Sequence, residues 1–250
     1  MEISVRADVR QARRYFEAVA KNQLPFALAK AITATGKTIK EEEYKTMRRV
    51  FDRPTPYTMN SLFLKSATKA RLEAKVWLKY DTFKGTPAEK YLLPQIAGGG
   101  RRHKRFENAL IAAGAMPGGF FAVPAMGADL DAYGNMRRGQ IVQILAYFRA
   151  FPEMGYKANM DAKGRKRLAK TTQRKLGIRY FALGKRRGKL GPGVYMVFTG
   201  SRQVRKVITF ARSVGYSKRF PYYEVADRVI GTQFKQNIDD AIEHALQSAR

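Results

Sequence analysis

The chain has 250 residues, and its 48 Lys and Arg against 20 Asp and Glu give a formal net charge of +28. It contains no cysteine and only two histidines, which excludes disulfides, thiol nucleophiles, zinc ribbons and iron–sulfur clusters and leaves too few ligands for a His-rich metal site. Because 45% of the residues are hydrophobic, the chain can build a folded core, and its unusual feature is the sign of its charge.

The N-terminal part of the chain predicts mostly helices. Residues 2–6 suit a short strand, and apolar residues spaced three and four apart predict an amphipathic helix over about 8–22. A longer, Ala-rich helix is expected over about 24–50, since Pro25 is tolerated in a first turn and Pro54 ends the pattern. The N-terminus lacks the apolar core of a signal peptide, and no segment approaches the roughly 20 apolar residues of a membrane span, so we expect a cytoplasmic origin and no membrane partner.

A short helix and a half-buried strand come next. Thr55 and Pro56 predict the start of a helix to about Leu62. Apolar and polar residues then alternate over 71–79, which is the period of a strand with one buried face. Trp77, the only tryptophan, lies on the polar face of that strand. We therefore expect Trp77 to contact a neighbouring subunit, because tryptophan is enriched at interfaces.

Glycine and proline punctuate residues 84–156, which favours a long, loop-rich insertion or arm. Two helices are expected inside it, over about 102–113 and 137–150. Its large aromatic residues are candidate contacts with a neighbouring subunit, namely Phe120, Phe121 and Tyr133.

Residues 157–219 contain nineteen Lys or Arg and one acidic residue, Asp161. Basic runs alternate here with apolar runs at 176–183 and 194–199, which predicts basic loops carried on a sheet and a hairpin formed by 194–199 and 204–211. A last helix is expected from Pro221. Such a surface favours DNA or an acidic protein as partner, the alternative being a solvated face that only keeps the chain soluble. The candidate contact residues are Lys163, Arg165, Lys166, Arg167, Lys185, Arg186, Arg187 and Lys189.

A second basic segment follows three glycines at 98–100 and precedes a predicted helix. A glycine turn that enters a helix offers free N–H groups and the positive end of the helix dipole, which suits an anion. An exposed linker explains the same pattern. The candidate contacts to DNA or an acidic partner in this segment are Arg101, Arg102, Lys104 and Arg105.

Three other motifs have simpler explanations. Residues 31–38 fit a relaxed phosphate-loop pattern with Ala31 in place of the first glycine, but they fall inside a predicted helix, so we treat the match as chance. Asp129 and Asp131 are more typical of turns than of a divalent-ion site. The aromatic residues beside Arg179 suit either a stacking platform for single-stranded nucleic acid or the core of a sheet.

Since no catalytic constellation is visible, we expect no enzyme, no cofactor and no metal.

These elements predict an α+β fold in which an antiparallel sheet packs with N-terminal and C-terminal helices. We expect a discontinuous core domain of residues 1–83 and 157–250, interrupted by the loop-rich insertion at 84–156.

The order of these elements resembles the minor tail protein Z, or tail-completion, family of tailed bacteriophages. The resemblance rests on 24–80, including the link from Asn60 to Val76, and on 190–246, including Phe234-Lys-Gln-Asn-Ile238. It covers about half of the chain, and 84–156 departs from the family pattern. It implies a structural virion protein of the tail or neck that joins head and tail. Its implied partners are a homo-oligomeric ring of itself, other tail, neck or portal-associated proteins, and genomic DNA nearby, with the host cytoplasm as its location before assembly.

Two further functions remain open at this point. A stand-alone basic nucleic-acid-binding protein would use the same Lys and Arg residues without a particle. A phosphate-loop NTPase would depend on Lys37. The geometry of the oligomer separates the first of these from a ring-forming virion protein better than salt dependence does, because both would bind polyanions.

Overall fold

The computed structural model describes residues 23–82, 85–172, 176–201 and 203–248. They form two compact units, which are described separately here. The helical unit comprises the described residues up to Ala97 and those from Lys218 onward, and the basic unit runs from Gly98 to Ser217. Helices and antiparallel sheets confirm the predicted α+β class. The strand and helix expected over 2–6 and 8–22 lie outside the described residues.

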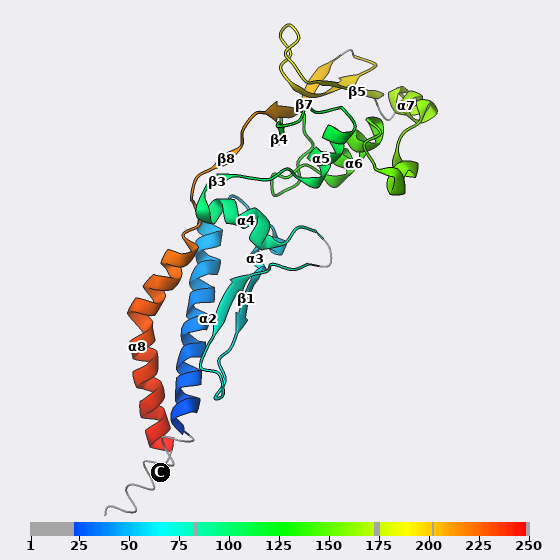
Figure 1. The fold of residues 1–250 in the computed structure, drawn as a ribbon. Coiled ribbons are helices and arrows are strands. Elements are labelled where there is room, and N and C mark those ends of the chain that lie inside the picture. Colours follow the sequence, from blue (N-terminus) through cyan, green and yellow to red (C-terminus); the bar gives the residue numbers. More distant parts are fainter. Residues whose placement is uncertain (1–22, 83–84, 173–175, 202, 249–250) are drawn as a thin grey trace, which may run out of the picture. The chain divides into compact units, whose positions relative to one another are not determined.

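Two long antiparallel helices dominate the helical unit, α2 (Leu24–Val50) and α8 (Tyr222–Ser248) (Figure 1). Buried alanines line their contact, with Ala27 and Ala31 packed among Ala241 and Ala245. Small side chains let two helix backbones approach closely. Across the same seam, the Asn237 side chain donates a hydrogen bond of 2.9 Å to Thr35 Oγ1.

Short elements complete the helical unit, namely α3 (Pro56–Met59), β1 (Leu62–Lys65), β2 (Lys75–Leu78) and α4 (Ala88–Ala97). The N–H of Thr58 donates to Thr55 Oγ1, which caps α3 as its Thr-Pro start predicts. A second core forms where Met47, Leu92 and Phe220 are buried together. β1 and β2 pair as an antiparallel hairpin that contacts α2.

The basic unit is built on a four-stranded antiparallel sheet in the order β4-β7-β6-β5. Helices α5 and α6 supply Leu110 and Ile144 to a core shared with Tyr180, Val194 and Phe210 of the sheet. Tyr180 Oη donates to Gln143 Oε1 at 2.8 Å, which ties β5 to α6. The elements of the unit are β3 (Gly99–Gly100), α5 (Arg105–Ala112), β4 (Phe121–Pro124), α6 (Arg138–Tyr147), the 3-10 helix η2 (Glu153–Ala158), α7 (Ala162–Ala169), β5 (Ile178–Leu183), β6 (Gly193–Phe198), β7 (Val204–Ala211) and β8 (Gly215–Tyr216).

The unit boundaries differ from the predicted ones. Residues 84–156 do not form one insertion, because α4 packs in the helical unit and Gly98 onward belongs to the basic unit. Strand β4 is the reason: it pairs with β7 of the main sheet, more than eighty residues later, with Phe121 opposite Ala211. The predicted discontinuity of the chain is retained, but it falls at 97/98 and 217/218.

The two basic runs also adopt different structures. Lys185–Lys189 lies in a loop between β5 and β6, as expected for a basic loop carried on a sheet. Lys163–Arg167, expected to be a loop as well, is helical in α7. Asp161 explains the difference, since its carboxylate accepts a 2.5 Å hydrogen bond from the N–H of Gly164 and so caps the helix.

Candidate nucleic-acid interface

Positive charge is concentrated in the basic unit. Residues 98–217 contain 24 of the 48 Lys and Arg but only five of the 20 Asp and Glu, so their net charge is +19 and the rest of the chain carries +9. A folded surface with this excess attracts polyanions over several ångströms and repels other cations. The arrangement of the basic side chains therefore decides what the unit can bind.

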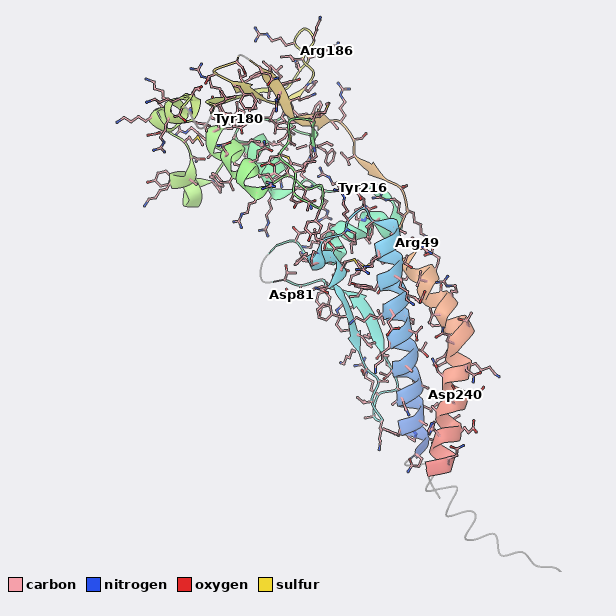
Figure 2. The ribbon with its side chains drawn as sticks, turned by 180° about the vertical axis from the view of Figure 1, so that it is seen from behind. Arg49, Asp81, Tyr180, Arg186, Tyr216 and Asp240 are labelled. Atoms are coloured by element: carbon pink, nitrogen blue, oxygen red, sulfur yellow. The ribbon has the colours of Figure 1, made fainter. Side chains whose placement is uncertain are left out.

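The first group of basic side chains lies on the loop between β5 and β6. We call Lys185, Arg186, Arg187 and Lys189 the tip cluster, and all four are exposed. Arg187 and Leu190 exchange backbone hydrogen bonds of 2.9 and 3.1 Å, which closes a tight turn. Gly188 occupies that turn with a φ of 59°, a conformation that costs glycine little. Figure 2 shows Arg186 at the far end of this loop.

The second group lies on and just after α7. Lys163, Lys166, Arg167 and Lys170 are exposed, and we call them the α7 cluster. Arg165 differs from them, because it is half-buried with its guanidinium 5.8 Å from the centre of the Tyr147 ring. Thr199 Oγ1 donates to the carbonyl of Ala169 at 2.7 Å and holds the end of α7 against the end of β6.

Strand β5 separates the two clusters. The α7 cluster lies near its first residue, Ile178, and the tip cluster follows its last residue, Leu183. A strand of six residues spans about 17–20 Å. Duplex DNA carries one phosphate charge per roughly 1.7 Å of helix axis, so a single duplex offers phosphates to both clusters.

Within the described part of the basic unit, neither cluster forms an ion pair. The ion pairs found there join Arg101 to Glu107 and Arg137 to Asp129. Within each cluster, four neighbouring cations that lack an ion pair repel one another, and an external polyanion would relieve that repulsion. This unbalanced charge is the strongest indication of a binding surface in the chain.

Arg101, predicted to contact DNA or an acidic partner, is instead held inside the unit. Its guanidinium donates to both carboxylate oxygens of Glu107 at 2.7 and 2.6 Å. The Arg101 side chain is 11% exposed and that of Glu107 is fully buried. Burial alone would raise the pKa of Glu107, but hydrogen bonds from Arg101 and from the N–H groups of Lys104 and Ala122 outweigh burial and lower it. Arg101 is therefore not part of the free basic surface.

Glu107 also changes the role of the helix start at α5. The N–H of Lys104, expected to be free for an anion, donates to Glu107 Oε2 at 2.5 Å. The carboxylate of Glu107 thus supplies the anion that this helix start favours. Arg102, Lys104 and Arg105 have exposed side chains and remain candidates for contact with DNA or an acidic partner.

The four predicted interface residues lie in different surroundings. Phe120 packs against the core of the basic unit, and Phe121 lies beneath Arg101 and stacks with His103 at a centroid distance of 4.6 Å. Both aromatic rings thus have partners within the chain. Tyr133 is exposed in a turn. Trp77 lies on β2, where its ring is close to that of Phe63, a residue that the sequence prediction overlooked.

The phosphate-loop-like segment, the acidic turn and the aromatic residues near Arg179 are parts of ordinary secondary structure, turns or core. Residues 31–38 lie wholly within α2, so no phosphate-binding loop forms there. Asp131 Oδ1 accepts hydrogen bonds from the N–H groups of Tyr133 and Asn135, which is the expected turn-forming role. Tyr180 is buried between the sheet and α6 (Figure 2), whereas its neighbour Arg179 is exposed.

Comparison with protein-family models, with curated proteins and with solved structures finds no match to this chain. In the described ranges, no group of three or more acidic or histidine side chains is arranged to hold a metal ion. No helix among the described elements is both long and apolar enough to span a bilayer.

Proposed function

We propose that this chain is a structural virion protein of a tailed bacteriophage that completes the tail and joins it to the head, assembling as a ring near the genome end. The observation that carries the proposal is the pair of basic clusters on one folded unit that form no ion pair among its described residues. In this role the tip and α7 clusters lie against the phosphates of the duplex that passes the ring. The role requires binding and assembly but no catalysis.

The placement of the segments that resemble the tail-completion family supports this proposal. Most of 24–80 and the end of 190–246 pack together in the helical unit, although they come from opposite ends of the chain. Within the motif at 234–238, Asn237 bonds to Thr35 and Ile238 packs against the alanine seam. The motif residues thus have a structural role in joining α2 to α8.

Replacing the tip cluster with four alanines should weaken duplex binding on the order of 100-fold at about 0.1 M salt, because four phosphate contacts are lost. The slope of log K against log salt concentration should become shallower by about 3 to 4. Fluorescence anisotropy of a labelled 20-base-pair duplex, titrated at several salt concentrations, measures both quantities.

A variant with the same change in total charge provides the control. Lys30, Lys37, Lys90 and Lys235 are exposed residues of the helical unit, and replacing all four with alanine removes four charges away from the tip cluster. We expect this control to lower affinity less than tenfold. Equal losses in the two variants would mean that net charge, not the tip cluster, controls binding.

Electron microscopy of the purified protein tests the assembly part of the proposal. Imaged with and without linear duplex DNA at physiological salt, the protein should form closed rings, and antibodies to it should label the head–tail junction of intact particles. Single copies that coat DNA without closing would reject the ring.

A stand-alone nucleic-acid-binding protein is the second candidate. The observation that favours it is that both clusters lie on one unit, so a single copy already presents a complete basic surface. This candidate predicts strong duplex binding by monomers, whereas the virion role predicts that rings form without DNA.

A further inference from the structure

The β1–β2 hairpin of the helical unit has two chemically different faces. Its register places Leu62 opposite Leu78, and both of these residues are buried. Because successive residues of a strand point to opposite faces, Phe63 and its partner Trp77 lie on the other face. The pair Lys65 and Lys75 lies on that outer face too, and so does Lys79, two residues after Trp77.

The two aromatic rings form a small platform on this face. Their centroids are 5.9 Å apart and their planes differ by 29°. The side chain of Phe63 is 40% exposed, and that of Trp77 is half-buried. Lys79 Nζ lies over the Phe63 ring, 5.8 Å from its centre, so a cation contacts the aromatic pair directly. We call Phe63 and Trp77 with Lys65, Lys75 and Lys79 the aromatic platform.

We propose that the aromatic platform binds single-stranded DNA, with unpaired bases stacked on Phe63 and Trp77 and the flanking phosphates held by Lys65 and Lys79. Every base has a flat π-face that can stack on an exposed aromatic ring, and a basic border follows the sugar–phosphate backbone. Stacking on aromatic side chains contributes to single-strand binding without requiring a particular sequence.

The lysines favour nucleic acid over a protein partner. Protein interfaces are enriched in tryptophan but depleted in lysine, so three lysines around an aromatic pair are atypical of them. Glu73, just before β2, accepts a 2.6 Å hydrogen bond from Arg71 and forms an ion pair of 3.3 Å with Lys75. Lys65 and Lys79 form no ion pair within the described residues. The platform therefore presents apolar rings and positive charge together.

The aromatic platform and the two basic clusters are proposed to bind different forms of DNA. The tip and α7 clusters are proposed to contact the backbone of duplex DNA, whereas the aromatic platform is proposed to contact unpaired bases from the other unit. Only the choice of DNA over RNA rests on the proposed virion role. The stacking itself would survive if that role were rejected.

Trp77 is the only tryptophan of the chain, so its fluorescence reports directly on the platform. Titration with a twelve-nucleotide oligothymidine should quench that fluorescence, since a base stacked on the indole changes its surroundings. Inorganic polyphosphate and a blunt duplex of equal length should quench it little, because neither offers unpaired bases. Equal quenching by polyphosphate would show a response to charge alone and would overturn the proposal.

Substitution of Phe63 separates binding from folding. Phe63→Leu keeps an apolar side chain in the hairpin but removes one ring, and we expect it to weaken oligothymidine binding about tenfold, the order expected for loss of one stacked base. Trp77→Leu should do the same when binding is followed by anisotropy of a labelled oligonucleotide. Circular dichroism checks that both variants fold. Wild-type affinity in the two folded variants would mean that the aromatic pair only stabilises the hairpin.

The variant with four alanines in the tip cluster distinguishes duplex binding by the basic unit from single-strand binding by the platform. It should lose duplex affinity and still show quenching of Trp77 by oligothymidine, because the platform lies in the other unit. Loss of quenching in that variant would place single-strand binding on the basic unit and reject the platform. An oligouridine of equal length that bound more tightly than oligothymidine would reject the choice of DNA.

Discussion

Replacing Arg101 with alanine is expected to destabilise the basic unit by about 3 to 5 kcal/mol, because Glu107 would remain as a buried charge without its partner. The guanidinium of Arg101 bonds to both carboxylate oxygens of Glu107, whose side chain is 0% exposed. The loss should appear as a lower midpoint in urea denaturation followed by circular dichroism. Amide exchange at Lys104 and Ala122 should also accelerate, since both N–H groups donate to Glu107.

Two variants show whether the buried charge is the cause. Arg102→Ala removes an exposed cation one residue away and should change stability by less than about 0.5 kcal/mol. In the double variant Arg101→Ala, Glu107→Gln, the buried group is neutral, so much of the lost stability should return. If Arg101→Ala folded as stably as Arg102→Ala and instead lost affinity for DNA, Arg101 would be a contact residue after all.

The role of Arg101 marks the limit of prediction from sequence for the site. Lys185–Lys189 lies on a loop as predicted, because a dense basic run can hardly be buried and apolar strands flank it. The run at 101–105 contains the same residue types. Arg101 of this run is nevertheless held inside the unit, because Glu107 follows in the next helical turn. Glu107 is buried against Ala122 of β4, and that contact exists only once the unit is folded.

Local signals predicted the elements of the fold better than its division into units. The bounds of α2 match the prediction, since Pro25 and the apolar period mark them, and the hairpin of β6 and β7 follows from its two apolar runs. β4 is only four residues long, and its position in the sheet is set by pairing with the distant strand β7. Residues near β4 in the sequence therefore do not predict it. Without β4, the segment 84–156 resembles an insertion.

Phe63 was overlooked for a related reason. Taken alone, Leu62–Lys65 is a short apolar stretch with no clear face. Pairing with β2 sets its register, and only then do Phe63 and Trp77 meet on the outer face. The contact of Trp77 with a neighbouring subunit stays a prediction, and the structure adds the aromatic and basic residues that surround its ring.

Glu43 is an unusual group in the helical unit, because an acidic side chain is rarely buried without a partner. Its side chain is 0% exposed, and neither carboxylate oxygen has a hydrogen-bond partner in the described structure. Burial, together with the nearby charge of Glu224 on α8 and against the opposing charge of Arg228 on the same helix, raises the pKa of Glu43 to about 8. Tyr222 of α8 also faces Glu43, whose charge contributes to raising the Tyr222 pKa.

This burial makes the free energy of unfolding depend on pH. The pKa of Glu43 is about 8 in the folded chain, against a reference value of 4.5, so the folded state holds a proton that the unfolded state releases between those values. The unfolded state therefore binds fewer protons in this range, and stability falls as pH rises. Between pH 5 and 8 the wild-type chain should lose about 3 to 4 kcal/mol through Glu43.

Glu43→Gln is expected to remove this loss, because the amide keeps the shape of the protonated acid and cannot ionise. The variant should match the wild type near pH 5 and exceed its stability by about 3 to 4 kcal/mol at pH 8. Urea denaturation at half-unit steps of pH, followed by Trp77 fluorescence, measures the difference in the helical unit. Glu42→Gln is the matched control: the 2.7 Å bond from Lys45 lowers the pKa of Glu42, so Glu42 causes no loss of stability as the pH rises. An unchanged pH slope in Glu43→Gln would mean that the carboxylate of Glu43 has a cationic or hydrogen-bonding partner in the folded protein.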